Sequence, residues 1–130
     1  MNVNTLERTA VAALEDIKAR DITVIDVSAL TSLFDRIIIA SADSTRQTRA
    51  LANHVRESVK AVGGTIHGVE GERSGEWILV DCGDVVVHVM QPAVRAYYDL
   101  EDLWGGSRPL PAQHGAEHSR GTRPGAIPPM

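Results

Sequence analysis

The segment GEWILVDCGDVVVHVM, residues 75–90, constrains the fold more than any other part of the chain because it is the densest apolar stretch. Two runs rich in β-branched and aromatic residues, Trp77–Asp81 and Val85–Met90, flank the dipeptide Cys82-Gly83. Such runs around a short glycine-containing loop predict a β-hairpin. Because cysteine tolerates a positive φ poorly, a longer loop with a shifted register is the alternative to a two-residue turn.

A tight turn would place Asp81 opposite Asp84 and Trp77 opposite His88, and alternation along the strands then defines two faces. The first face is purely aliphatic and is predicted to point to the core: Ile78, Val80, Val85, Val87 and Val89. The second carries Trp77, Leu79, Asp81, Asp84, Val86, His88 and Met90. This mixture of aromatic, titratable and acidic groups is typical of recognition surfaces. The alternative interpretation is a half-buried Trp–His pair beneath a covering helix.

The chain has the composition of one globular domain. Its 130 residues are 43% hydrophobic, enough for one core but not for two. No apolar run approaches the roughly 20 residues that span a bilayer, and the N-terminus lacks the pattern of a secretory signal. A single cysteine, Cys82, excludes an internal disulfide. These features predict a cytoplasmic protein.

Charge is distributed unevenly along the chain. Residues 1–65 are balanced, whereas residues 66–104 contain eight acidic and only two basic residues, a net charge of −6. Such a region repels nucleic-acid phosphates and attracts a basic protein.

The order of the predicted elements indicates a single α/β domain over residues 1–104. Its sheet should be mixed and flanked by helices, because a hairpin is antiparallel. We expect a helix over about Thr5–Ala19, strands at Ile22–Val27 and Phe34–Ala40, a helix at Thr45–Val62 capped by Ser44, a short strand at Thr65–Val69, the hairpin, and a helical end from Pro92 to Trp104. Residues 105–130 contain five glycines and five prolines and are predicted to form a disordered tail.

Catalytic and metal-binding patterns are not apparent. Asp26, Asp35, Asp81 and Asp84 lie at or near strand ends, where metal-dependent enzymes place ligands, but no Asp-x-Asp pair, HExxH motif or glycine-rich phosphate loop accompanies them. Cys82 and His88 lie too far apart along the hairpin for a nucleophile–base pair. We therefore expect no enzyme, metal or cofactor. A cryptic metal-dependent, nucleotide-using enzyme remains one alternative. RNA binding through Arg46, Arg49, Arg56 and Lys60 is another.

Recognition chemistry is better represented. Residues 75–104 contain nearly all the aromatic residues of the chain, together with Arg95, and these are the types that dominate interface hot spots. The aromatic members are Trp77, Tyr97, Tyr98 and Trp104.

Three segments closely resemble the ribosomal silencing factor family, also called RsfS or Iojap. They are DITVIDVS, FDRIIIASADSTRQTRALANHV and EGERSGEWILVDCGDVVVHVMQPAVRAYYDLEDLW, within residues 6–104. The last is the most specific, because it combines the tryptophan, the hairpin, the histidine and the R-x-x-Y-x-L-E-x-L-W ending. The main departure is Ser41–Ser44, where the family usually has a turn containing threonine and glycine.

The resemblance implies a domain similar to the nucleotidyltransferase fold but without its catalytic carboxylates. It also implies binding to the large ribosomal subunit through the ribosomal protein L-fourteen (L14) at the intersubunit face. There the protein would block joining of the small subunit and repress translation, with a homodimer as the implied free form. The contact residues that it implies are Glu70, Trp77, Ile78, Leu79, Asp81, His88, Arg95 and Tyr98.

Overall fold

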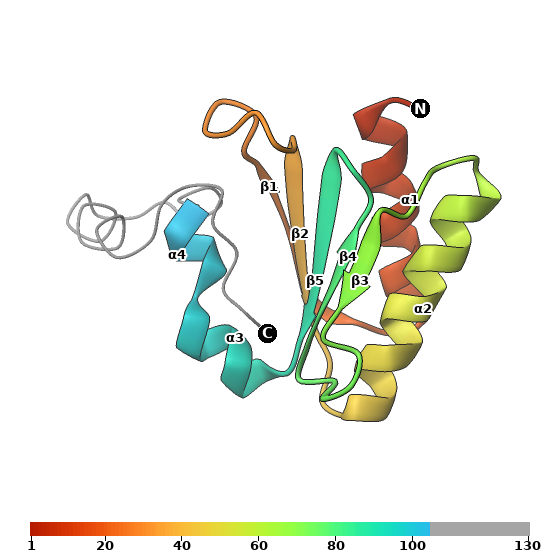
Figure 1. Cartoon of the computed structure of the whole chain (residues 1–130). Helices are drawn as coiled ribbons and strands as arrows, with labels where there is room; N and C mark the ends of the chain where they lie inside the picture. The colour runs from red at the N-terminus through yellow and green to blue at the C-terminus, as the bar shows by residue number, and fades with distance from the viewer. Residues whose placement is uncertain (105–130) are drawn as a thin grey trace.

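The computed structural model describes residues 1–104, which form four helices and five strands around one sheet (Figure 1). The elements are α1 (Val3–Asp16), β1 (Arg20–Asp26), β2 (Arg36–Ser41), α2 (Thr45–Ala61), β3 (Gly68–Glu70), β4 (Trp77–Asp81), β5 (Val85–Met90), α3 (Pro92–Tyr98) and α4 (Leu100–Trp104). The predicted tail, residues 105–130, lies outside the described residues.

The sheet has the strand order β1-β2-β5-β4-β3. β2 and β5 are parallel, and the other three neighbouring pairs are antiparallel. The predicted mixed sheet is therefore confirmed. The likeness to the nucleotidyltransferase fold stays a prediction.

The hairpin between β4 and β5 forms with a wider loop than the two-residue turn. Asp81 pairs with Val86 and Trp77 with Met90, so the predicted Trp77–His88 and Asp81–Asp84 pairings are wrong by two residues. The Asp81 carboxylate accepts the Gly83 amide, and the Cys82 amide donates to the Val85 carbonyl. Within this loop the positive φ falls on Gly83 and not on Cys82. A two-residue shift preserves side-chain alternation, and both predicted faces persist.

Helices α1 and α2 lie side by side over one face of the sheet (Figure 1). Their buried side chains, including Leu14, Leu51 and Val55, pack with Ile78, Val87 and the other aliphatic residues of the first hairpin face. α2 begins as predicted, because the Ser44 side chain accepts the Gln47 amide. α1 begins earlier than predicted, since its N-cap is Asn2 rather than Asn4.

The second hairpin face lies beneath α3 and α4 and forms a second core. Trp77, Leu79, Val86 and Met90 cluster with Ile25, Val27, Phe34, Ile37, Ile39, Leu100 and Trp104. The C-terminal helical region is broken at Asp99, which adopts φ 49°, and Leu100 and Trp104 of α4 pack into this second core. The expectation that this face is open is therefore wrong for its aromatic, aliphatic and histidine side chains, which are buried as in the alternative interpretation, whereas Asp81 is intermediate and Asp84 exposed.

No helix described between residues 1 and 104 is both long enough and apolar enough to traverse a bilayer.

Candidate partner-binding surface

A stack of three aromatic groups runs from the second core to the surface of α3. The buried Trp77 indole donates its Nε1–H to Nδ1 of His88 over 2.9 Å. Its ring lies 4.8 Å from that of Tyr98, centroid to centroid, and Tyr98 lies 5.0 Å from Tyr97 in an edge-to-face arrangement. Tyr97 is 81% exposed and Tyr98 41%, whereas Trp77 and His88 are at most 4% exposed. The stack thus presents two tyrosines on a fixed base.

His88 is held as a neutral ring. Burial lowers the pKa of His88 to about 3 because the interior penalises the charged form. Since Nδ1 accepts the indole hydrogen bond, the single ring proton of the neutral form resides on Nε2. The imidazole therefore accepts the indole hydrogen bond and fixes the orientation of Trp77.

Arg95 fastens α3 and α4 to the first two strands. Its guanidinium donates to the backbone carbonyl of Asp21, the hydroxyls of Thr23 and Ser41, and the carboxylate of Glu101. The ion pair with Glu101 measures 2.6 Å, and both side chains are largely buried. The first strand, the second strand and α4 thus meet at one side chain. Arg95, which the family resemblance implied as a contact residue, has its hydrogen-bonding capacity directed inward.

The structure separates the predicted contact residues into three groups. Glu70 and Tyr98 are exposed, and Asp81 and Arg95 are intermediate. Trp77, Leu79 and His88 are buried on the side of the sheet that carries α3 and α4, and Ile78 points to the opposite core. Four of the eight thus have no direct access to a partner in this conformation. No observation tests contact itself, which stays a prediction.

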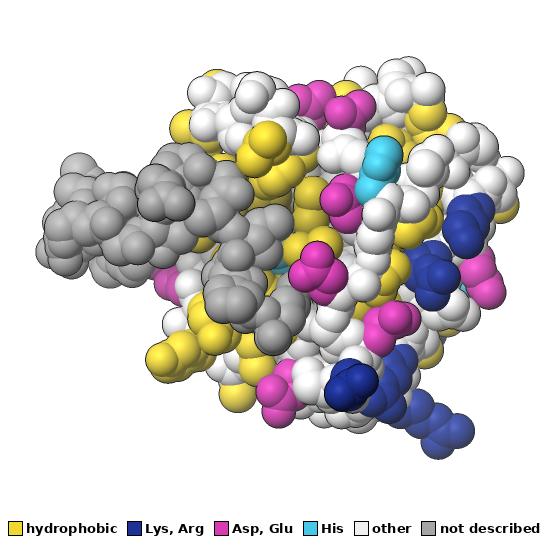
Figure 2. Space-filling model, in the orientation of Figure 1, with side chains coloured by type: hydrophobic (Ala, Val, Ile, Leu, Met, Phe, Trp, Pro, Cys, Tyr) yellow, Lys and Arg dark blue, Asp and Glu magenta, His cyan; other side chains and the backbone are white. Residues whose placement is uncertain are grey.

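The accessible members share one side of the sheet. Glu70 pairs with Leu79 across β3 and β4, and directly opposed residues point to the same face. Leu79 and Asp81 are two residues apart on β4 and also share that face. Glu70 and Asp81 therefore lie on the side that carries α3. Figure 2 shows acidic side chains interspersed with hydrophobic ones across the middle of the view, with basic side chains toward the α2 side.

Tyr97 is the exposed aromatic residue that the implied contact set omitted. It precedes Tyr98 on a seven-residue helix in which no residue is buried. Composition marked it among the hot-spot types, but only the packing of α3 shows that it is the more exposed tyrosine.

The four aspartates of the enzymatic alternative lie at one end of the sheet. Asp26 ends β1 and Asp81 ends β4, while Asp35 and Asp84 directly precede β2 and β5. Within residues 1–104, no three His, Cys, Asp or Glu side chains are grouped so that they could hold a metal ion. The Ser28 hydroxyl and amide bind Asp26 and lower the pKa of its carboxyl, which is an ordinary turn arrangement.

The basic residues of the RNA-binding alternative are partly engaged within the protein. Arg49 donates to the carbonyls of Glu72 and Arg73, and Arg56 forms an ion pair with Glu72. These contacts hold the loop before β4 against α2. They favour a structural role for Arg49 and Arg56, two of the four basic residues.

A sequence model of the family described as "Ribosomal silencing factor during starvation" matches residues 1–126. The ribosomal silencing factor RsfS of Chromobacterium violaceum is 58% identical over 109 residues, which cover 84% of this chain and 89% of that protein. A crystal structure of a protein from the same organism superposes with a TM-score of 0.80 at 55% identity, covering 92% of this chain and 99% of the other. The mouse protein named mitochondrial assembly of ribosomal large subunit protein 1 is 34% identical over 97 residues, covering 72% of this chain and 42% of that protein.

Proposed function

Because this chain belongs to the ribosomal silencing factor family, we propose that it binds the large ribosomal subunit through L14 at the intersubunit face. Bound there, it prevents the small subunit from joining and so represses translation. The mouse relative's name, which refers to assembly of the large subunit, supports the choice of that subunit.

The observation that carries the proposal is the exposed tyrosine pair on a rigid base. Tyrosine side chains supply large contact areas at low conformational cost, and interface hot spots are enriched in them. Here Tyr98 rests on Trp77, which is itself fixed by His88. The pair therefore needs little ordering on binding, and less free energy is lost when the complex forms.

The charge of the surrounding surface supports a basic partner. Glu70 and Asp81 lie on the side of the sheet that carries α3, in the region with a net charge of −6. Complementary charge raises the association rate and disfavours binding to RNA phosphates. We assign Glu70, Asp81 and Tyr98 as direct contacts. Trp77, Leu79, His88 and Arg95 support them from beneath, and Ile78 supports β4 from the other core.

The mechanism requires no bond to be made or broken. A specific interface of about 800 Å² per partner would occupy only part of this domain and leave the remainder as a steric obstacle. We place the protein in the cytoplasm, where it would meet ribosomal subunits. A homodimer is its proposed form off the ribosome.

Subunit association followed by light scattering tests the proposal. Purified large subunits preincubated with the protein should join small subunits more slowly and to a lower extent than untreated ones. Unchanged joining of subunits from the matching organism would contradict the proposed function.

Binding to isolated large subunits tests the assigned surface. Tyr98→Ala should weaken binding by about 2 kcal/mol, roughly 30-fold in Kd, as truncation of a hot-spot residue does. Glu70→Lys should weaken binding mainly at low salt. Arg46→Ala, an exposed change on α2, is the matched control and should bind as wild type does. Wild-type affinity in a folded Tyr98→Ala protein would reject the surface.

A further inference from the structure

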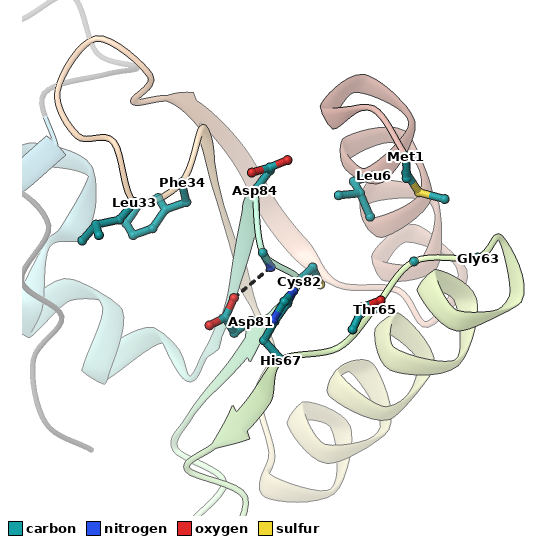
Figure 3. A pocket seen from close by; sticks show the side chains of 12 residues that line it. Met1, Leu6, Leu33, Phe34, Gly63, Thr65, His67, Asp81, Cys82 and Asp84 are labelled. Carbon is teal, nitrogen blue, oxygen red and sulfur yellow. Dashed lines mark hydrogen bonds between the residues drawn. The ribbon is translucent and has the colours of Figure 1, made fainter.

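An open groove lies at the end of the sheet where β4 passes into β5 (Figure 3). Its volume is about 690 Å³. Leu33 and Phe34 approach it from one side and Met1 and Leu6 from the other, while the loop from Asp81 to Asp84 lies between them. The groove thus joins the start of the chain, the segment before β2 and the β4–β5 loop.

The groove combines apolar walls with acidic groups. Leu33 is 68% exposed and Met1 55%, whereas Phe34 beneath Leu33 is buried. Asp84 is exposed and Asp81 is intermediate. The carboxylate of Asp81 accepts the amide of Gly83, which leaves it lone pairs for a further donor. Such a site fits a segment that places a cation beside an apolar side chain.

The described part of the chain ends next to the groove. Trp104, the last described residue, packs its ring edge-to-face on Phe34 at a centroid distance of 5.7 Å. Asp35 and Arg36, which follow Phe34 in the chain, both donate their amides to the Asp84 carbonyl. Trp104 at the end of α4 therefore lies beside Phe34, and the segment that follows Phe34 is hydrogen-bonded to Asp84.

The sequence after Trp104 has the required chemistry. Residues 105–130 carry three arginines and one glutamate, opposite in sign to the groove. Arg108-Pro109-Leu110-Pro111 pairs a cation with an apolar residue, only four residues beyond Trp104. Four residues can span up to about 13 Å. The two prolines have a fixed φ, which lowers the conformational entropy that docking must overcome.

We propose that the groove is the docking site of the chain's own segment 108–111, with Arg108 directed to the carboxylates of Asp81 and Asp84 and Leu110 placed between Leu33 and Met1. Because the segment is tethered, its effective concentration at the groove is on the order of millimolar, so modest contacts are sufficient. Docking covers the apolar side chains that the described part of the chain leaves exposed at this end.

Paramagnetic broadening in the full chain tests the proposal without ribosomes, so its outcome is independent of the proposed function. Ala112→Cys provides a site for a nitroxide label. Cys82 will not compete for the label at pH 7 because it is buried and its thiol pKa is raised to about 12. Docking predicts selective loss of amide signal intensity at Leu33, Thr65 and Gly83.

The contact must also depend on the named side chains. Arg108→Gln combined with Leu110→Ser should restore those signals, and Asp84→Asn should restore them in part. The matched control Arg120→Gln removes an arginine outside the segment and should leave the broadening unchanged. The amide spectrum of residues 1–104 checks in each variant that the domain is folded.

Three results would overturn the proposal. Broadening spread evenly over the surface would show that the segment does not dock. Broadening that survives the Arg108→Gln, Leu110→Ser change, or that responds only to Arg120→Gln, would assign the contact to other residues. Broadening that appears equally when labelled and unlabelled chains are mixed would show contact between molecules instead of within one.

Discussion

Replacing His88 with leucine tests whether the buried Trp77–His88 pair behaves as the structure indicates. Leucine fills a similar volume but has no acceptor for the Trp77 Nε1–H, which is buried and donates to His88 Nδ1 over 2.9 Å. Leaving one buried donor without a partner costs about 1–3 kcal/mol. His88→Leu should therefore lower the free energy of unfolding by about that amount at pH 7.

The pH dependence of the free energy of unfolding gives a second, independent test of the buried histidine. Burial lowers the pKa of His88 to about 3 from its ordinary value of 6.5. Between these two values the unfolded chain binds a proton that the folded chain excludes, so stability is complete above about pH 6.5 and falls as the pH drops toward 3. Between pH 7 and pH 5 the loss from this group is about 2 kcal/mol. His88→Leu lacks it, so its deficit relative to wild type should largely disappear at pH 5.

Urea unfolding at pH 7 and pH 5, followed by tryptophan fluorescence, measures both quantities by linear extrapolation. His67→Gln, which removes an exposed histidine, is the matched control and should retain the wild-type difference between the two pH values. An identical deficit for His88→Leu at both pH values would refute the assignment of His88 as a buried neutral ring.

Three further predictions concern the fold around the site. Arg95→Met removes the guanidinium contacts to β1, β2 and α4 and leaves Glu101 without its ion-pair partner; unfolding experiments should show a loss of about 3 kcal/mol. Gly71 has φ 89°, and a Cβ at this position would lie 1.9 Å from the Trp77 carbonyl oxygen. Gly71→Ala should therefore lower the free energy of unfolding by about 3 kcal/mol in thermal unfolding. The control Gly68→Ala, whose Cβ meets nothing within 4 Å, should change it by less than about 0.5 kcal/mol. Cys82 is buried with a raised thiol pKa, so native protein at pH 8 should react with a thiol reagent far more slowly than urea-unfolded protein.

The sequence predicted the hairpin faces because side-chain alternation survives a change of loop length. The loop widened by two residues, and every residue nevertheless kept its face. It also predicted the start of α2, since the Ser44 cap is a local interaction.

Sequence reasoning misplaced the accessible surface because it could not show where the last helices pack. A face with Trp77, His88 and Met90 suits either an interface or a core beneath a helix, and composition does not distinguish them. The helical region breaks at Asp99, Leu100 and Trp104 of α4 pack into the second core with Trp77, and Tyr97 and Tyr98 of α3 stay exposed.

The sequence by itself determined the mixed α/β architecture and the family, since periodicity, caps and the specific motif of residues 70–104 are all local in the chain. Only the tertiary structure decided the roles of individual side chains. Arg95 links strands and helices because residues as distant in sequence as Asp21 and Glu101 bind its guanidinium. Trp77 supports Tyr98 because the two rings pack against each other. Such roles depend on contacts between residues distant in sequence, and no local pattern specifies them.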